Sequence, residues 1–143
     1  MEEEIWERLY QCAAAALRPR TVSPFVEAGG VASAILSKSG AIYTGVCIDT
    51  ACTLGMCAER NAISTMLTQG EHEITKLVCV MADGTVGFPC GACRELLMQL
   101  SKNSPDIEIL TDYTAKTTVR LHTLMPNWWG TARFEREEAC KNG

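Results

Sequence analysis

The chain has 143 residues, of which 47% are hydrophobic and 21% charged, with a formal net charge of -4. This length is near the common size of one globular domain, so we expect a single domain over residues 1–143 with its own core. The acidic pI of about 5.2 argues against a nucleic-acid partner, because such binders normally carry a basic stripe. No apolar run reaches the roughly 18 residues of a membrane span, and the acidic start MEEEIWERLY lacks the basic segment of a secretory signal. We therefore expect a cytoplasmic protein with no membrane partner.

Hydrophobic periodicity predicts alternating helices and strands along the chain. The expected elements are a helix over 2–17, strands over 31–36 and 42–48 joined by a turn, a helix over 57–67, a strand over 75–81, a helix over 90–100, strands over 107–111 and 117–121, and a weakly helical, charged end after Pro126. The segment from Ser23 to Gly30 is expected to be a loop. This order predicts an α/β fold, with one sheet that carries helices on its faces.

Eight cysteines are many for this length. They stand at positions 12, 47, 52, 57, 79, 90, 93 and 140. A disulfide framework is typical of smaller secreted domains, whereas spaced cysteines in a cytosolic protein point to metal ligands or reactive thiols. Cys12 and Cys79 fall on apolar faces and are expected in the core.

Three of these cysteines lie in two short segments, each at the start of an expected helix. The segments are Cys57-Ala58-Glu59-Arg60 and Pro89-Cys90-Gly91-Ala92-Cys93. Helix starts carry positive potential and free N–H groups, which stabilise thiolates. A closed structural zinc site has four protein ligands, whereas a catalytic site has three and leaves a position for water. Cys57, Cys90 and Cys93 therefore predict a catalytic zinc site; a structural zinc site and a thiol redox site are the alternatives.

Two neighbours of the first ligand have predicted roles of their own. Three thiolates and one Zn²⁺ sum to a charge of -1, so Arg60 is expected to donate hydrogen bonds to the ligand sulfurs. Glu59 is expected to move protons between water and a substrate nitrogen. The C-x-E and P-C-x-x-C elements together match the zinc deaminase signature, with Cys in place of His.

These motifs resemble the tetrameric cytidine deaminase family, which includes blasticidin S deaminase. The resemblance covers most of the chain and is carried by residues 31–34, 43–45, 54–60, 89–95 and 124–126. It implies a three-layer α/β/α sandwich around a mixed five-stranded sheet. It also implies one Zn²⁺ per chain, hydrolytic deamination at C4 of a cytosine nucleoside or analogue, and a homotetramer with pockets shared between subunits. The resemblance further implies that the Ala58 backbone contacts the base edge and that Trp129 covers the base from a neighbouring subunit.

The chain departs from the family pattern where the family grips the ribose. The usual Asn-x-Glu after the second strand reads Cys47-Ile48-Asp49 here, and the following loop is one residue short. Cysteine is a weak hydrogen-bonding group. Cys47 and Asp49 are therefore candidate substrate-binding residues for either an ordinary cytosine nucleoside or a modified one such as blasticidin S. A role in pyrimidine salvage and one in antibiotic resistance both remain open, as does a non-catalytic zinc-binding protein.

Overall fold

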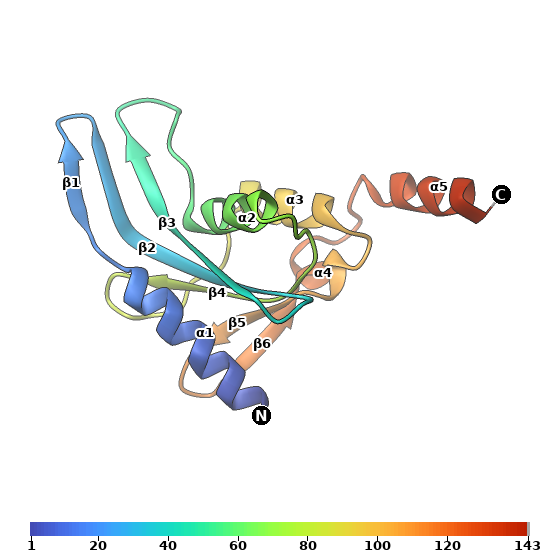
Figure 1. The fold of residues 1–143 in the computed structure, drawn as a ribbon, viewed down its shortest axis with the longest axis horizontal. Coiled ribbons are helices and arrows are strands. Elements are labelled where there is room, and N and C mark those ends of the chain that lie inside the picture. Colours follow the sequence, from blue (N-terminus) through green and yellow to red (C-terminus); the bar gives the residue numbers. More distant parts are fainter. Residues whose placement is uncertain (143) are drawn as a thin grey trace.

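A mixed sheet between helices forms the body of the protein in the computed structural model, which describes residues 1–142 (Figure 1). The elements are α1 (Glu2–Ala16), β1 (Arg20–Ser23), β2 (Val26–Ser37), β3 (Ile42–Thr50), α2 (Ala58–Thr68), β4 (Ile74–Met81), α3 (Gly91–Leu100), the 3-10 turn η1 (Ser104–Asp106), β5 (Glu108–Asp112), β6 (Thr117–Arg120), α4 (Leu121–Leu124) and α5 (Thr131–Asn142). None of the helices within 1–142 combines the length and the hydropathy needed to cross a membrane.

The long strand β2 organises the sheet. β3 pairs antiparallel with one edge of β2, while β1 and β4 pair antiparallel with successive parts of its other edge. β4 pairs parallel with β5, and β5 pairs antiparallel with β6. The expected α/β fold with a mixed sheet is confirmed, but the expected count of five strands is wrong: the sheet has six strands.

The extra strand is β1, which lies in a stretch where no strand was expected. β1 forms a hairpin with the start of β2, and β2 begins at Val26 rather than at residue 31. Gly29 has a φ of +83°, and it lies where the pairing of β2 with β3 shifts register. A Cβ at this position would lie 2.1 Å from the carbonyl oxygen of Arg18. Gly29 therefore marks an irregularity within a strand, although in the sequence it reads as a loop residue.

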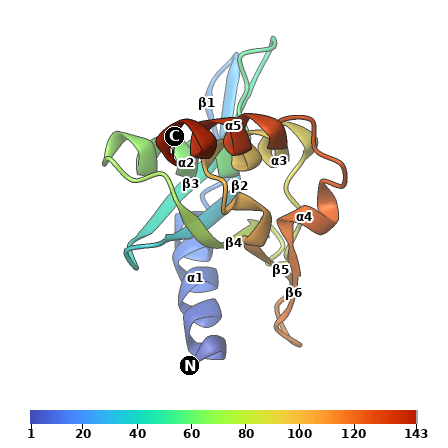
Figure 2. The same ribbon diagram turned by 90° about the vertical axis from the view of Figure 1, so that its right-hand side faces the viewer.

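Two hydrophobic clusters cover the two faces of the sheet. Side chains of a strand alternate between faces, so Ala32 and Ala34 of β2 face α1 while Ile35 faces the other helices. The α1 side is built from Trp6, Leu9, Ala13, Ala32, Ala34, Val78, Val80 and Leu110. Figure 2 shows α1 on one side of the sheet and α2 with α3 on the other. The three-layer arrangement and the amphipathic first helix are both confirmed.

The close packing of α2 on β3 positions the start of α2. A Cβ at Gly45 of β3 would lie 2.3 Å from the backbone N of Ala62 and 2.7 Å from the carbonyl oxygen of Ala58. Only a residue without a side chain lets the helix backbone come this close. The contact fixes the first turn of α2 against the sheet.

The end of the chain leaves the body of the molecule. The strand expected over 117–121 ends at Arg120, and Leu121 begins the short helix α4. The predicted C-terminal helix is present as α5, which extends beyond α3 in Figure 1. Over residues 131–141 its side chains are exposed except for the half-buried Phe134.

Candidate metal centre and active site

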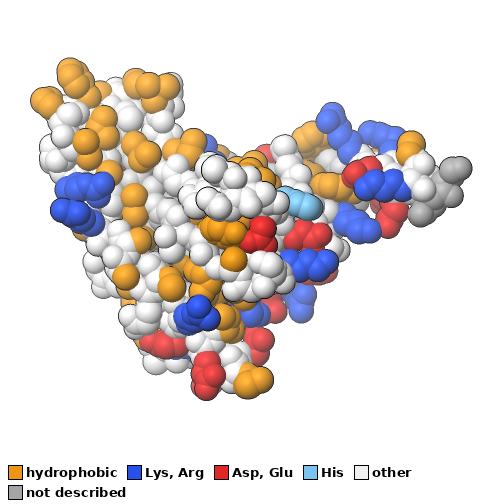
Figure 3. All heavy atoms as spheres, in the orientation of Figure 1, with side chains coloured by type: hydrophobic (Ala, Val, Ile, Leu, Met, Phe, Trp, Pro, Cys, Tyr) orange, Lys and Arg blue, Asp and Glu red, His pale blue; other side chains and the backbone are white. Residues whose placement is uncertain are grey.

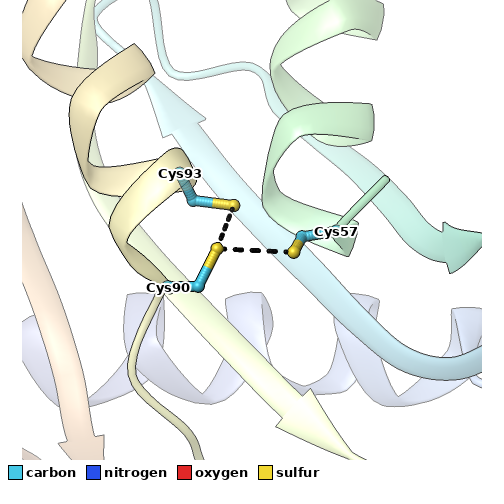
Figure 4. A group of neighbouring side chains, drawn as sticks. All are labelled: Cys57, Cys90 and Cys93. Carbon is cyan, nitrogen blue, oxygen red and sulfur yellow. Dashed lines mark hydrogen bonds between the residues drawn. The ribbon is translucent and has the colours of Figure 1, made fainter. Parts of the chain in front are cut away.

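Three sulfur atoms meet where the starts of α2 and α3 approach each other (Figure 4). Cys57 and Cys90 are the residues that precede α2 and α3, and Cys93 lies in the first turn of α3. The Sγ atoms of Cys57 and Cys90 are 3.4 Å apart, and those of Cys90 and Cys93 are 3.6 Å apart. All three atoms lie within 4.8 Å of one another.

The spacing of the sulfurs fits a tetrahedral zinc ion. Zn–S bonds of about 2.3 Å at tetrahedral angles place two sulfurs about 3.8 Å apart, close to the spacing found here. Among residues 1–142, this is the one group of three or more His, Cys, Asp or Glu side chains with such geometry. Three sulfurs from two helix starts therefore offer a three-ligand site and no fourth ligand of these types.

The three thiols differ in how readily they ionise. Burial raises the pKa of Cys57, against a hydrogen bond from Arg60 that lowers it. Burial also raises the pKa of Cys93, and the carboxylate of Glu59 raises it further. Burial opposes ionisation of Cys90 as well, but hydrogen bonds from the backbone N–H of Cys93 and from the neighbouring thiols hold its pKa below the ordinary value. A bound cation would offset the cost of burying these thiolates.

Arg60 provides positive charge beside the sulfurs. Its Nη2 lies 3.8 Å from Cys57 Sγ, and contacts with Cys57 and Cys93 raise the pKa of its guanidinium. Its Nε is buried and has no hydrogen-bond partner. A buried donor without a partner costs free energy. The attraction between the guanidinium and the sulfurs must offset this cost for the side chain to keep its orientation.

Glu59 is a buried carboxylate beside the metal ligands. Its side chain is 3% exposed, and its Oε2 accepts a hydrogen bond from Cys93 Sγ at 3.0 Å. The first turn of α2 thus places a proton acceptor next to the sulfur cluster.

A cavity of about 450 Å³ opens onto this cluster. It brings together most of the residues that the sequence singled out. Of these, Cys47, Asp49, Cys57, Ala58, Glu59, Arg60 and Cys90 all line it. Cys93 is fully buried and does not itself line the cavity, but its Sγ contacts the carboxylate of Glu59, which does.

The two departures from the family pattern face this cavity together. Cys47 Sγ accepts a hydrogen bond from the Val31 backbone N–H at 3.2 Å, and lies 3.9 Å from Asp49 Oδ2. The sulfur of Cys47 is therefore already engaged by the protein. The carboxylate of Asp49 on the same wall accepts hydrogen bonds and donates none, and its Oδ2 lies within hydrogen-bond distance of the Cys47 thiol.

Apart from the buried Cys93, Trp129 is the predicted site residue that does not line the cavity of its own chain. The residue is 62% exposed, and its indole N–H donates a hydrogen bond to the carboxylate of Glu95. The guanidinium of Arg133 lies 5.1 Å from its ring centroid.

Several lining residues were not singled out as part of the site. Phe88 and Met81 line the cavity and are partly exposed, at 55% and 38%. Cys79 lines it as well, although it is almost fully buried as expected of a core residue; burial, and then the charge of Glu59, raises its pKa. The alternation of β4 could have placed Cys79 on the α2 side of the sheet, because Val78 and Val80 face α1.

A sheet flanked by helices, with a carboxylate beside three sulfurs at two helix starts, is the architecture of the zinc-dependent deaminase class. Comparisons with known proteins agree. Residues 6–105 match the family model described as the cytidine and deoxycytidylate deaminase zinc-binding region. A cytidine deaminase of Mycobacterium tuberculosis is 30% identical over 108 residues, which cover 75% of this chain and 77% of that protein.

Solved structures show the same fold. The crystal structure of cytidine deaminase from Mycobacterium leprae superposes with a TM-score of 0.71 at 30% identity, over 85% of this chain and 98% of that one. Cytidine deaminase from Burkholderia pseudomallei gives a TM-score of 0.67 at 26% identity, over 85% and 96%. The chain belongs to the cytidine deaminase family, and the expected enzyme class, a hydrolase acting on a C–N bond, is confirmed.

Proposed function

We propose that this chain hydrolyses the exocyclic C–N bond of a cytosine nucleoside, such as cytidine or deoxycytidine, and releases the uracil nucleoside and ammonia. The observation that carries the proposal is the buried carboxylate of Glu59, 3.0 Å from a sulfur of the three-cysteine cluster. A proton acceptor and a metal site thus adjoin one cavity, which has space for a nucleoside.

Each residue of the cluster has a distinct role in this reaction. Cys57, Cys90 and Cys93 would hold one zinc ion per chain. Bound zinc supplies Lewis acidity, which lowers the pKa of water by several units. Glu59 takes one proton from the water that adds to C4 and delivers it to the ring nitrogen N3. It then takes the remaining proton from the oxygen on C4 and delivers it to the amine, which leaves as ammonia while the C4 carbonyl forms. The backbone of Ala58, which lines the cavity beside Glu59, contacts the edge of the base.

Arg60 limits the net charge of the metal site. Three thiolates and one Zn²⁺ leave one negative charge, and the guanidinium 3.8 Å from Cys57 offsets it. The guanidinium reduces the electron density that the thiolates donate to a bound metal ion. The ion would then keep more of its Lewis acidity toward water.

The sugar side of the cavity sets which cytosine compound is accepted. Asp49 offers a carboxylate that accepts hydrogen bonds from sugar hydroxyls or from another donor group. Cys47 has its sulfur bonded to the Val31 N–H and adds little to this recognition. This engaged sulfur favours a second candidate, a modified cytosine nucleoside such as blasticidin S, whose sugar-side groups differ from those of ribose.

A homotetramer with shared pockets is part of the proposal. Large hydrophobic side chains at Val22, Phe25 and Leu54 are 57%, 71% and 78% exposed, and Figure 3 shows hydrophobic side chains gathered at the end of the molecule where β1, β2 and β3 project. Exposed apolar surface of this kind is typical of protein–protein contacts. In the assembly, Trp129 of one subunit would cover the base held by another.

The rival interpretations explain less of the site. A redox pair at Cys90 and Cys93 gives no role to Cys57 or to the buried Glu59. A non-catalytic zinc site gives no role to Glu59, whose burial as a carboxylate is costly.

All eight cysteines are free of disulfide bonds, which supports a cytoplasmic location.

The test is ammonia release by the zinc-loaded protein, screened across cytidine, deoxycytidine, cytosine and blasticidin S. We expect turnover of at least one nucleoside. We expect no turnover of free cytosine, because it has no sugar to contact the sugar-side wall of the cavity. Release of ammonia from none of the four compounds by a protein with full zinc would overturn the proposed function. Turnover of blasticidin S alone would select the second candidate.

A further inference from the structure

A single carboxylate on the metal-binding helix holds two consecutive tryptophans. Glu95 lies on α3, two residues after Cys93. Its oxygens accept the indole N–H of Trp128 at 3.1 Å and that of Trp129 at 3.1 and 3.2 Å. The amide of Gln99, one turn further along α3, donates to the same carboxylate at 2.8 Å.

The two indoles have different environments. Trp128 is half-buried and packs against the cluster of core residues beneath α2 and α3. Trp129 is exposed, and its ring centroid lies 5.7 Å from that of Trp128 at an angle of 53°. Asn127, just before them, has a φ of +55°, a left-handed conformation that asparagine adopts more readily than most residues. The turn therefore anchors the first indole and presents the second to the surroundings.

The chemistry of the acceptor suits this arrangement. An ionised carboxylate has two acceptor oxygens and no donor, so it can serve two N–H groups at once. A glutamine in its place would have one acceptor oxygen and would turn an NH₂ group toward one of the indoles. Charge-assisted hydrogen bonds are also stronger than neutral ones. Glu95 is thus able to fix the orientation of an exposed tryptophan that has little packing of its own.

We propose that Glu95 is a positioning residue for Trp129, which it ties to the helix that carries Cys90 and Cys93. This inference rests on the proposed function, in which Trp129 covers the base in a neighbouring subunit. The orientation of the Trp129 ring over the base would then be set by Glu95 on α3 of the same subunit as Trp129. Glu95 touches neither substrate nor metal in this account and acts through the indole.

Steady-state kinetics of Glu95→Gln, Trp129→Phe and the double variant test the proposal. If the cover binds substrate and transition state equally, its loss raises KM and leaves kcat nearly unchanged. We expect each single variant to raise KM by about 3- to 10-fold, and the double variant to be no worse than Trp129→Phe, because residues that act through one contact are not additive. Glu135→Gln, a matched change on α5, should leave KM unchanged. A double variant whose KM increase is the product of the two single increases would overturn the proposal.

A spectroscopic measurement tests the same contact without substrate. Near-UV circular dichroism reports fixed aromatic packing. Glu95→Gln should reduce the tryptophan signal at least as much as Trp129→Phe does, because it also removes the hydrogen bond of Trp128, while the buried Trp6 is unaffected. An unchanged spectrum for Glu95→Gln would overturn the positioning role, whatever compound the enzyme turns over. Absence of turnover together with a changed spectrum would count against the proposed function and leave the contact between Glu95 and Trp129 supported.

Discussion

The carboxylate of Glu59 lies 3.0 Å from the sulfur of Cys93, although 34 positions separate the two residues in the chain. The contact joins the first turn of α2 to the first turn of α3. It places the proposed proton carrier and one of the proposed metal ligands side by side beneath the same cavity.

The three sulfurs act as one site, so each should be required for zinc. We expect Cys57→Ser, Cys90→Ser and Cys93→Ser each to lose most of the bound zinc, because a hydroxyl is a poor substitute for a thiolate ligand. Metal analysis of the purified variants checks this. Cys140→Ser, at an exposed position on α5, should keep the zinc content of the unmodified protein. Full zinc in the Cys93→Ser variant would remove that residue from the ligand set.

Arg60 should strengthen zinc binding without touching the metal. Arg60→Ala leaves the net negative charge of three thiolates and one Zn²⁺ without a neighbouring cation, and loss of such an outer contact typically weakens metal affinity by about 10- to 100-fold. Competition with a zinc chelator measures the change. Arg8→Ala, on the exposed side of α1, is the matched control. Equal zinc affinity in the Arg60→Ala variant and the unmodified protein would contradict the role assigned to the guanidinium.

Gly45 should be intolerant of any side chain. Gly45→Ala places a methyl group 2.3 Å from the backbone N of Ala62, so α2 must move away from the sheet. Overpacking of this kind costs about 1–3 kcal/mol, and the shift should also reduce zinc content, because Cys57 moves with α2. Denaturant unfolding and metal analysis measure both effects. Gly30→Ala meets no heavy atom within 4 Å and should be nearly neutral; similar losses in the two variants would argue against close packing as the cause.

Glu7 should contribute to stability at neutral pH but not in acid. Hydrogen bonds from Gln11 and then from Tyr113 hold the pKa of its carboxyl below the ordinary value of 4.5. A carboxyl whose pKa is lowered by folding stabilises the protein above its unfolded pKa, and this contribution is lost as the pH falls through the folded-state pKa. The difference in Tm between the unmodified protein and Glu7→Gln should therefore be largest near neutral pH and shrink below about pH 4. A difference that does not vary with pH would show that the charge of Glu7 is not involved.

The metal site could be predicted from the sequence because its signals are local. Cys57 and Cys90 each stand at a helix start, and the three-residue spacing of Cys90 and Cys93 already places them on one side of a helix. The proximity of the two helix starts came from the family resemblance, since no local pattern brings together residues 33 positions apart.

Features that depend on distant contacts could not be predicted in this way. The start of β2 was missed because Gly29 signals a loop, whereas its conformation accompanies a register shift between β2 and β3. The pairing of Glu95 with Trp128 and Trp129 joins α3 to the tail, and no periodicity indicates it. Phe88 gave no signal because it lies in a loop, where exposure cannot be deduced from hydrophobic spacing.

Ammonia release from cytidine by Glu59→Gln, beside the unmodified protein at equal zinc content, tests the central claim most directly. The amide keeps the size of the side chain but cannot carry a proton between water and the base, so we expect turnover to fall by about 100- to 10,000-fold while fold and zinc are retained. Glu3→Gln, on the exposed part of α1, should keep full activity. Turnover by the Glu59→Gln variant within a few-fold of the unmodified protein would contradict the account.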